Sequence, residues 1–375
     1  GMAAILENDA VATTDSRYDI QIRDQVDAAL FDRRVTKEGF GLTEWLRDHM
    51  QAGQGVGYDP RLHTPAQIAA MEAALKPKAI TLKALGENPL DAVWTDQPGA
   101  PADPVEVFPE AIAGRSAQDK RESIGKAILE SGAEAAVITQ PDSIAWLLNI
   151  RGNDVPHTPF ALSYAIVHAD GAVDWFIDKK KITPAVQAHI GNQVQVKDPA
   201  TLETSLFALA GKGVQVDPDR SAIWFRQVLE RAGAKIVPHE NPCVLPKACK
   251  TKEEQDAIRN AHLRDGVNVT KFLVWLDGEA AKGTLTELDA VEKLEEFRAL
   301  DKGFRDTSFD TISGWAAHGA IVHYRATQES NVTITPPGIL LLDSGAQYTE
   351  GTTDITRTIA IGAPTEEQKK AFTLV

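Results

Sequence analysis

Apolar and polar residues follow one pattern in two distant segments of the chain. Residues 3–21 read AAILENDAVATTDSRYDIQ, and residues 164–182 read YAIVHADGAVDWFIDKKKI. Each predicts a strand, a polar turn with Asp, and a second strand that ends at an acid. Residues 55–60 and 213–218 also match each other, at nearly the same offset of about 160 residues. These matches, in one order, predict a duplicated α/β domain.

The second copy has an earlier half that the first copy lacks. A helix is expected after the cap at Ser116, with Ile124 and Ile128 on one face, followed by a strand at 135–139. We therefore expect the first domain to lack about 45 residues of such a unit.

The expected domain boundaries follow from this duplication and from the prolines. We expect an incomplete first domain at 1–88 and a stiff, proline-rich linker at 89–115. The second domain is expected at 116–245 and a third at 246–375.

The third region predicts helices first and antiparallel strands afterwards. Thr251 and Thr286 each begin a helix in a capping pattern. Strands are expected at 320–324, 332–334, 339–343 and 353–361. A further helix starts at 365 and runs to the last residue without a C-cap, so we expect the chain to be cut at both ends. The fold class is therefore α/β in the two copies and α+β in the third region.

Composition excludes several classes of protein. The 375 residues carry a formal net charge of −14, which disfavours binding to nucleic acid and to anionic membranes. No apolar run is long enough for a membrane span. The only cysteines are Cys243 and Cys249, so a disulfide scaffold is excluded and a reducing cytoplasm fits. Residues 53–58, GQGVGY, lack the spacing of a dinucleotide-binding loop.

The candidate chemistry lies in residues 340–358, LLLDSGAQYTEGTTDITRT. A hairpin centred on Tyr348 and Thr349 would place Asp343 directly opposite Asp354, with Cβ atoms about 4.5–5.5 Å apart. Two carboxylates so close repel each other unless one is protonated or a cation lies between them. Hard cations such as Mn²⁺ and Mg²⁺ prefer carboxylate oxygen. Two acids that simply face solvent at strand ends are the alternative interpretation.

Neighbouring residues extend this hypothesis. Thr356 shares the face of Asp354 by the strand period, so it is placed to support a metal ligand by a hydrogen bond. His323 lies in the apolar run AIVHY and reads either as a functional residue or as a core histidine. His318 lies five residues earlier, on the opposite face of one strand, so the two histidines are not expected to chelate together.

The C-terminal region resembles a known family. Residues 308–362, with DSGAQY and GTTDITRT, resemble the aminopeptidase P branch of the creatinase/prolidase, or pita-bread, metallopeptidases. WTDQP, SIAWLLNIRGNDVPHTP and KTKEEQDAIRNAHLRDG extend the resemblance to the long form with three domains. That form carries two related creatinase-N-like domains before the catalytic one, the plan that the duplication predicts independently.

The resemblance implies roles for particular residues. Asp343 would bind one metal ion, and Asp354 would bridge two ions, usually Mn²⁺, that activate water against the carbonyl before a proline. His323 would hydrogen-bond the substrate and stabilise the tetrahedral intermediate. Arg151 would reach the substrate or a neighbouring subunit, with a structural salt bridge as the alternative. The implied partner is a peptide with proline in second position, and a homodimer stays open.

The sequence departs from the family pattern at two points that bear on metal binding. His318 stands where the family usually has Asn, and the family needs one further His and two Glu well beyond Asp354. We therefore expect weak metal binding and little or no activity from these 375 residues alone. The alternatives are a prolidase-like dipeptidase, a non-catalytic pita-bread binding module and a metal-free creatinase-like hydrolase.

Overall fold

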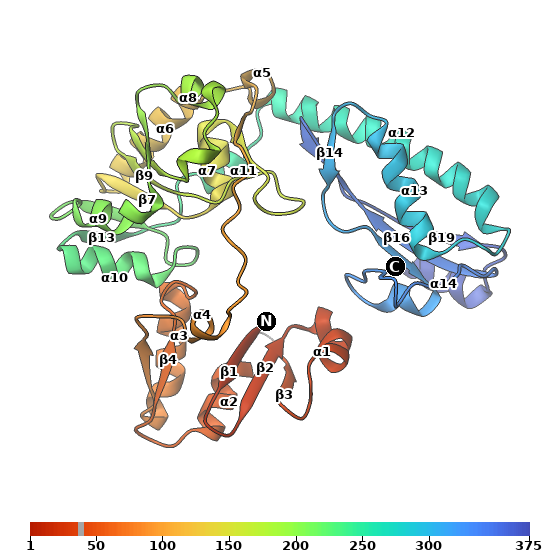
Figure 1. Cartoon of the computed structure of the whole chain (residues 1–375), viewed down its shortest axis with the longest axis horizontal. Helices are drawn as coiled ribbons and strands as arrows, with labels where there is room; N and C mark the ends of the chain where they lie inside the picture. The colour runs from red at the N-terminus through yellow and green to blue at the C-terminus, as the bar shows by residue number, and fades with distance from the viewer. Residues whose placement is uncertain (37–40) are drawn as a thin grey trace. The chain divides into compact units, whose positions relative to one another are not determined.

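The computed structural model describes residues 1–36 and 41–375, which form two compact units (Figure 1). The first unit contains residues 1–108, 115–154 and 160–249, and the second contains residues 109–114, 155–159 and 250–375. In the described residues, no helix is both long enough and apolar enough to cross a membrane.

The second copy is a complete mixed sheet with helices on both faces. Its strands lie in the order β11-β10-β9-β7-β12-β13, in which β9 is antiparallel to both neighbours. Two separate apolar clusters, one around Trp175 and one around Phe176, fill the two faces. The elements are β7 (Ala135–Ile138), β9 (Tyr164–His168), β10 (Val173–Phe176), β11 (Val194–Lys197), β12 (Gly213–Val216), β13 (Lys235–Pro238), α6 (Ala117–Glu130), α7 (Pro141–Leu148), α8 (Pro184–Ile190), α9 (Leu202–Phe207) and α10 (Ile223–Ala232).

The first copy repeats this order from β9 onward, which confirms the predicted duplication. Its antiparallel β1–β2 pair and parallel β2–β3 pair correspond to β9–β10 and β10–β11, and parallel β4–β5 corresponds to β12–β13. In the described residues, no strand equivalent to β7 joins β1 to β4, so the copy has two separate sheets. The elements are β1 (Met2–Ile5), β2 (Ala10–Thr14), β3 (Asp32–Val35), β4 (Gly55–Tyr58), β5 (Thr81–Ala84), α1 (Asp19–Gln25), α2 (Gly41–His49) and α3 (Pro65–Leu75).

The repetition extends to individual hydrogen bonds. Asp59 after β4 accepts a hydrogen bond from the Asn88 side chain at 2.9 Å, and Asp217 after β12 accepts one from the Asn241 backbone at 2.8 Å. Each Asn side chain then accepts from a backbone N–H two residues on, at 2.9 Å in both copies. Each of the aspartates that the sequence pattern aligned therefore accepts a hydrogen bond from an Asn whose side chain forms a local turn.

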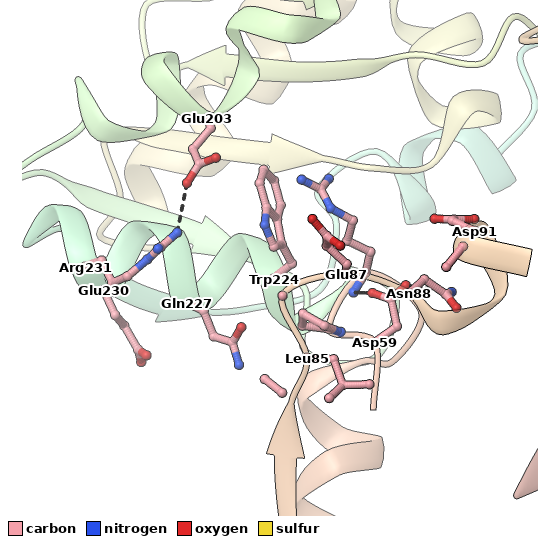
Figure 2. Close-up of a pocket in the computed structure, with 15 residues that line it drawn as sticks. Asp59, Leu85, Glu87, Asn88, Asp91, Glu203, Trp224, Gln227, Glu230 and Arg231 are labelled. Atoms are coloured by element: carbon pink, nitrogen blue, oxygen red, sulfur yellow. Dashed lines mark hydrogen bonds and ion pairs between the residues drawn. The ribbon is translucent and has the colours of Figure 1, made fainter. Parts of the chain in front are cut away.

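A groove of about 1140 Å³ lies where the loops of the first copy meet α10 (Figure 2). Arg61 stacks over the Trp224 ring at 3.9 Å, and the backbone N–H of Trp224 donates to the Pro60 carbonyl at 3.0 Å. The groove is lined by both acids and bases, among them Glu203 and Arg231, which pair at 2.9 Å. No residue of the predicted site lines it.

The segment expected as an extended linker, 89–115, contains regular structure. It forms α4 (Pro89–Val93), β6 (Glu106–Val107) and α5 (Glu110–Ala113), with β6 paired antiparallel to β8 (Ile150–Arg151). The first of these elements forms because Asn88 caps a helix and Pro89 suits its first turn.

The second unit has the predicted α+β order. Helices α12 and α13 run side by side along one face of sheet β15-β16-β19 (Figure 1). Buried Phe272, Leu276 and Leu294 on the helices pack against Leu340 and Ile361 on the sheet. A second sheet has the order β14-β17-β18. The elements are α12 (Lys252–Ala280), α13 (Glu287–Ala299), β14 (Phe304–Thr307), β15 (Ile312–Trp315), β16 (Gly338–Ser344), β17 (Ala346–Tyr348), β18 (Gly351–Thr352), β19 (Ile355–Ile361) and α14 (Glu366–Leu374).

Two predicted strands are wrong. Residues 316–320 form a 3₁₀ helix and His323 lies in a turn at φ 58°, so no strand covers 320–324. In 332–334 only Thr333 makes an isolated bridge, to Thr286. The apolar run is instead a loop whose Tyr324 and Ala326 are buried against Ile312. Tertiary packing, not alternation, therefore determines the local conformation.

Candidate metal site on the β16–β19 hairpin

The hairpin carrying the two acids has one register along its whole length. Asp343 pairs with Thr356, and Tyr348 pairs with Gly351, so the turn is Thr349–Glu350. The predicted direct opposition of Asp343 and Asp354 is therefore wrong by two residues. The reason is Tyr348, which is only 5% exposed and whose hydroxyl donates to a buried carboxylate at 3.0 Å. A ring in that environment cannot occupy a turn.

The two acids nevertheless lie on one face. Side chains alternate with a period of two, so a shift of two residues preserves the face. Buried Thr353 and half-buried Ile355 flank the exposed Asp354, as alternation requires, and Ile355 packs into the helix-side core. Asp354 is thus the diagonal neighbour of Asp343, a relation that spans about 7–8 Å instead of 4.5–5.5 Å.

Thr356 contacts the first acid directly. Its hydroxyl donates to Asp343 Oδ1 at 2.6 Å. This bond occupies one carboxylate oxygen and restricts the rotation of the group, which leaves the second oxygen available to a ligand. Asp343 is half-buried, whereas Asp354 and Thr356 are exposed.

The chemistry of these acids fits a hard divalent cation, but their number is small. Within residues 1–36 and 41–375, neither carboxylate forms an ion pair with a basic side chain. In the same residues, no group of three or more His, Cys, Asp or Glu is placed to hold a metal ion. A divalent ion normally takes about six ligands, so these residues supply only part of a coordination shell.

His323 lies on a loop that is attached to a buried carboxylate. Glu287, at the start of α13, is fully buried and accepts from the Trp315 backbone at 2.7 Å and the Tyr324 hydroxyl at 3.0 Å. His318 Nδ1 lies 2.9 Å from the same carboxylate. Burial, with the hydrogen bond to Glu287 among the further causes, raises the pKa of Tyr324. His323 itself is exposed.

Arg151 belongs to the first unit, unlike the acids of the hairpin. It lies on β8, where its guanidinium stacks over the Phe108 ring at 3.7 Å and donates to the Ile150 carbonyl at 2.8 Å. Both contacts are with residues of that unit.

Sequence reasoning missed a buried ion pair beneath the hairpin. Asp265 on α12 and Arg298 on α13 have no exposed side-chain surface and bond to each other at 2.8 and 3.1 Å. A signal for them was present, because Asp265 lies among the buried positions Ala261, Val269 and Phe272 of one helix stripe. A charge within an apolar stripe requires a partner at the same depth.

Comparisons with known proteins cover the whole chain. The sequence profile of the creatinase/prolidase N-terminal domain matches residues 96–254, and that of metallopeptidase family M24 matches residues 256–375. "Probable Xaa-Pro aminopeptidase P" from Aspergillus niger is 37% identical over 389 residues and covers 100% of this chain. The protein of the same name from Paracoccidioides brasiliensis is 35% identical over 392 residues and also covers 100% of this chain. The chain spans 63% of the length of each relative.

Solved structures give the same fold. An X-prolyl aminopeptidase from Caenorhabditis elegans, described as a cytosolic enzyme with a di-nuclear active site, matches with a TM-score of 0.90 and 29% identity. That match covers 97% of this chain and 60% of the other. An Xaa-Pro dipeptidase from Bacillus anthracis matches with a TM-score of 0.55 and 19% identity over 69% of each chain, which shows the fold alone.

Proposed function

We propose that the chain, whose residues 256–375 match metallopeptidase family M24, works in an Xaa-Pro aminopeptidase. Such an enzyme releases the N-terminal residue of a peptide whose second residue is proline. The observation that carries this proposal is that Thr356 pairs with Asp343 and donates to its carboxylate, with Asp354 exposed two residues before Thr356. The whole-chain match to Xaa-Pro aminopeptidases P supports it over a dipeptidase, whose matched structure covers 69% of this chain.

Each residue of the hairpin has a role in the proposal. Asp343 and Asp354 would hold the divalent ions, and Thr356 would keep the Asp343 carboxylate in the binding orientation. Two bound ions, for which we propose Mn²⁺, supply an activated water and a polarised carbonyl. The described acids provide two ligands, so we expect weak binding and little or no hydrolysis from these 375 residues alone.

Other residues act on the peptide. His323 donates a hydrogen bond to the substrate near the scissile bond and stabilises the negative charge of the tetrahedral intermediate. His323 lies in an exposed turn. Arg151, whose guanidinium stacks on Phe108, is proposed to contact substrate or a second subunit of a homodimer. A cytoplasmic location fits the paucity of cysteine.

The test uses the product of the complete reading frame that contains these residues, loaded with Mn²⁺. Release of the first residue is measured from a Phe-Pro-Ala tripeptide and from Phe-Ala-Ala. We expect cleavage of the proline peptide only, and its loss in Asp343→Asn and Asp354→Asn. Asp277→Asn, an exposed acid on α12, is the matched control and keeps activity. Equal cleavage of both peptides, or none by the loaded wild type, contradicts the proposal.

A further inference from the structure

The buried pair Asp265–Arg298 contacts both strands of the acid-bearing hairpin. On the arginine side, Nη1 donates to the Gly345 carbonyl and Nη2 to the Ser344 hydroxyl, both at 3.2 Å. On the aspartate side, Thr353 donates to Oδ2 at 2.5 Å. Ser344 directly follows one candidate ligand and Thr353 directly precedes the other. The pair therefore reaches each strand one residue away from an acid.

The strand pairing itself is interrupted at this point. Residues 345, 353 and 354 lie outside every strand, between the β16–β19 ladder and the β17–β18 ladder. The chain passes there from one sheet to the other, and a Cβ at Gly345 would come within 2.0 Å of Ser308 Oγ and 2.3 Å of the Thr353 carbonyl. Across this gap the Thr353 backbone N–H still donates to the Ala346 carbonyl at 2.9 Å, but Asp354 itself lies in neither ladder. Its position therefore depends on the contacts of its neighbours, Thr353 among them.

Alternation of side chains does not determine the register either. A slip of two residues keeps every side chain on its face, so hydrophobic burial distinguishes the two registers poorly. The hydrogen bonds of Asp265 do distinguish them, because Tyr348 and Thr353 lie on opposite sides of the turn and both donate to its carboxylate, at 3.0 and 2.5 Å. A slip would move these two residues relative to each other. Mutual repulsion of the two surface acids works against their proximity, so an external constraint is required.

We propose that Asp265 and Arg298 are positioning residues that set the register of the hairpin and hold Asp343 and Asp354 on one face at the spacing of a metal site. A buried ion pair is weak evidence for stability, and selection of one register is the best-attested use of such groups. Four of the hydrogen bonds made by this pair go to the hairpin, to Ser344, Gly345, Tyr348 and Thr353. The inference about register is independent of the proposed function. Only the consequence of the register for metal binding rests on the proposed function.

The first experiment reads the register without any metal. Leu341 and Thr358 are directly paired on the acid-bearing face, so the double variant Leu341→Cys/Thr358→Cys, with exposed Cys249 changed to Ser, should form a disulfide. We expect Arg298→Met to lower the rate of disulfide formation by about tenfold under native conditions, and Thr353→Val to lower it less. Arg298→Lys, which keeps the charge, should restore part of the rate. An unchanged rate in Arg298→Met overturns the proposal.

A control shows whether loss of a buried ion pair elsewhere in the chain also slows the reaction. Lys181 and Asp154 form another buried pair, at 2.5 Å, in the first unit. Lys181→Met should destabilise its own unit and leave the disulfide rate unchanged. If Lys181→Met slows the reaction as much as Arg298→Met, the effect is not specific to the hairpin and the proposal fails.

The second experiment measures Mn²⁺ binding from the electron paramagnetic resonance signal of the free ion. Arg298→Met should weaken binding by about 10–100-fold, the range found for residues that orient ligands. Wild-type affinity in Arg298→Met, with the disulfide rate lowered, overturns the link between register and metal. If wild type and Asp343→Asn bind equally, the proposed function fails, whereas the disulfide result still decides the register.

Discussion

Removal of Arg298 should strongly destabilise the second unit. The Arg298→Met variant leaves the fully buried Asp265 carboxylate without its cationic partner; among the described residues, the hydroxyls of Tyr348 and Thr353 remain as donors. Loss of one partner of such a pair costs about 3–5 kcal/mol. Because two donors remain, we expect a value near the lower limit, about 3 kcal/mol. The carbonyl of Gly345 also loses a donor.

Native-state hydrogen exchange, followed by mass spectrometry on peptides of α12 and β16, measures this free energy in the second unit alone. Arg259→Met is the control, since Arg259 also bonds to a carboxylate, at 2.9 Å, but its side chain is 63% exposed. An exposed pair contributes about 0–1 kcal/mol, so the control should change little. If Arg298→Met lowers the free energy of unfolding no more than Arg259→Met does, the buried pair stabilises the second unit no more than an exposed pair.

Three further changes have defined outcomes. Thr356→Val removes the hydroxyl that orients Asp343 and should weaken Mn²⁺ binding by about 10–100-fold in a titration, without loss of helical circular dichroism. Gly345→Ala places a Cβ against the Thr353 carbonyl, so thermal unfolding of the second unit should occur at lower temperature. Burial raises the pKa of Glu295 above 4.5, so its charge destabilises the fold increasingly as pH rises from that value; Glu295→Gln should stabilise the protein at pH ~7 and have least effect at acid pH.

The duplication was predictable because it lies in local patterns. Strand, turn and acid recur in both copies, and Asp15 and Asp178 each cap a short 3₁₀ helix through a backbone N–H two residues on. These features depend on residues close in sequence, and two similar sequences therefore give two similar folds.

The register of the hairpin was not predictable in the same way. Alternation gave the correct face for Asp343 and Asp354, but a shift of two residues leaves alternation unchanged. The turn is placed by the burial of Tyr348 against α12 and by its bond to Asp265, which are contacts between distant segments. The prediction of a strand at 320–324 failed for a related reason. Glu287, on another element, accepts a hydrogen bond from Tyr324 and so holds this segment as a loop.

The claim that Asp343 and Asp354 together bind a divalent cation is tested most directly by Mn²⁺ titration of the purified chain, with the free ion followed by electron paramagnetic resonance. The account predicts measurable binding by wild type and by Asp277→Asn, and a loss of at least about tenfold in both Asp343→Asn and Asp354→Asn. Equal binding by all four proteins would contradict it.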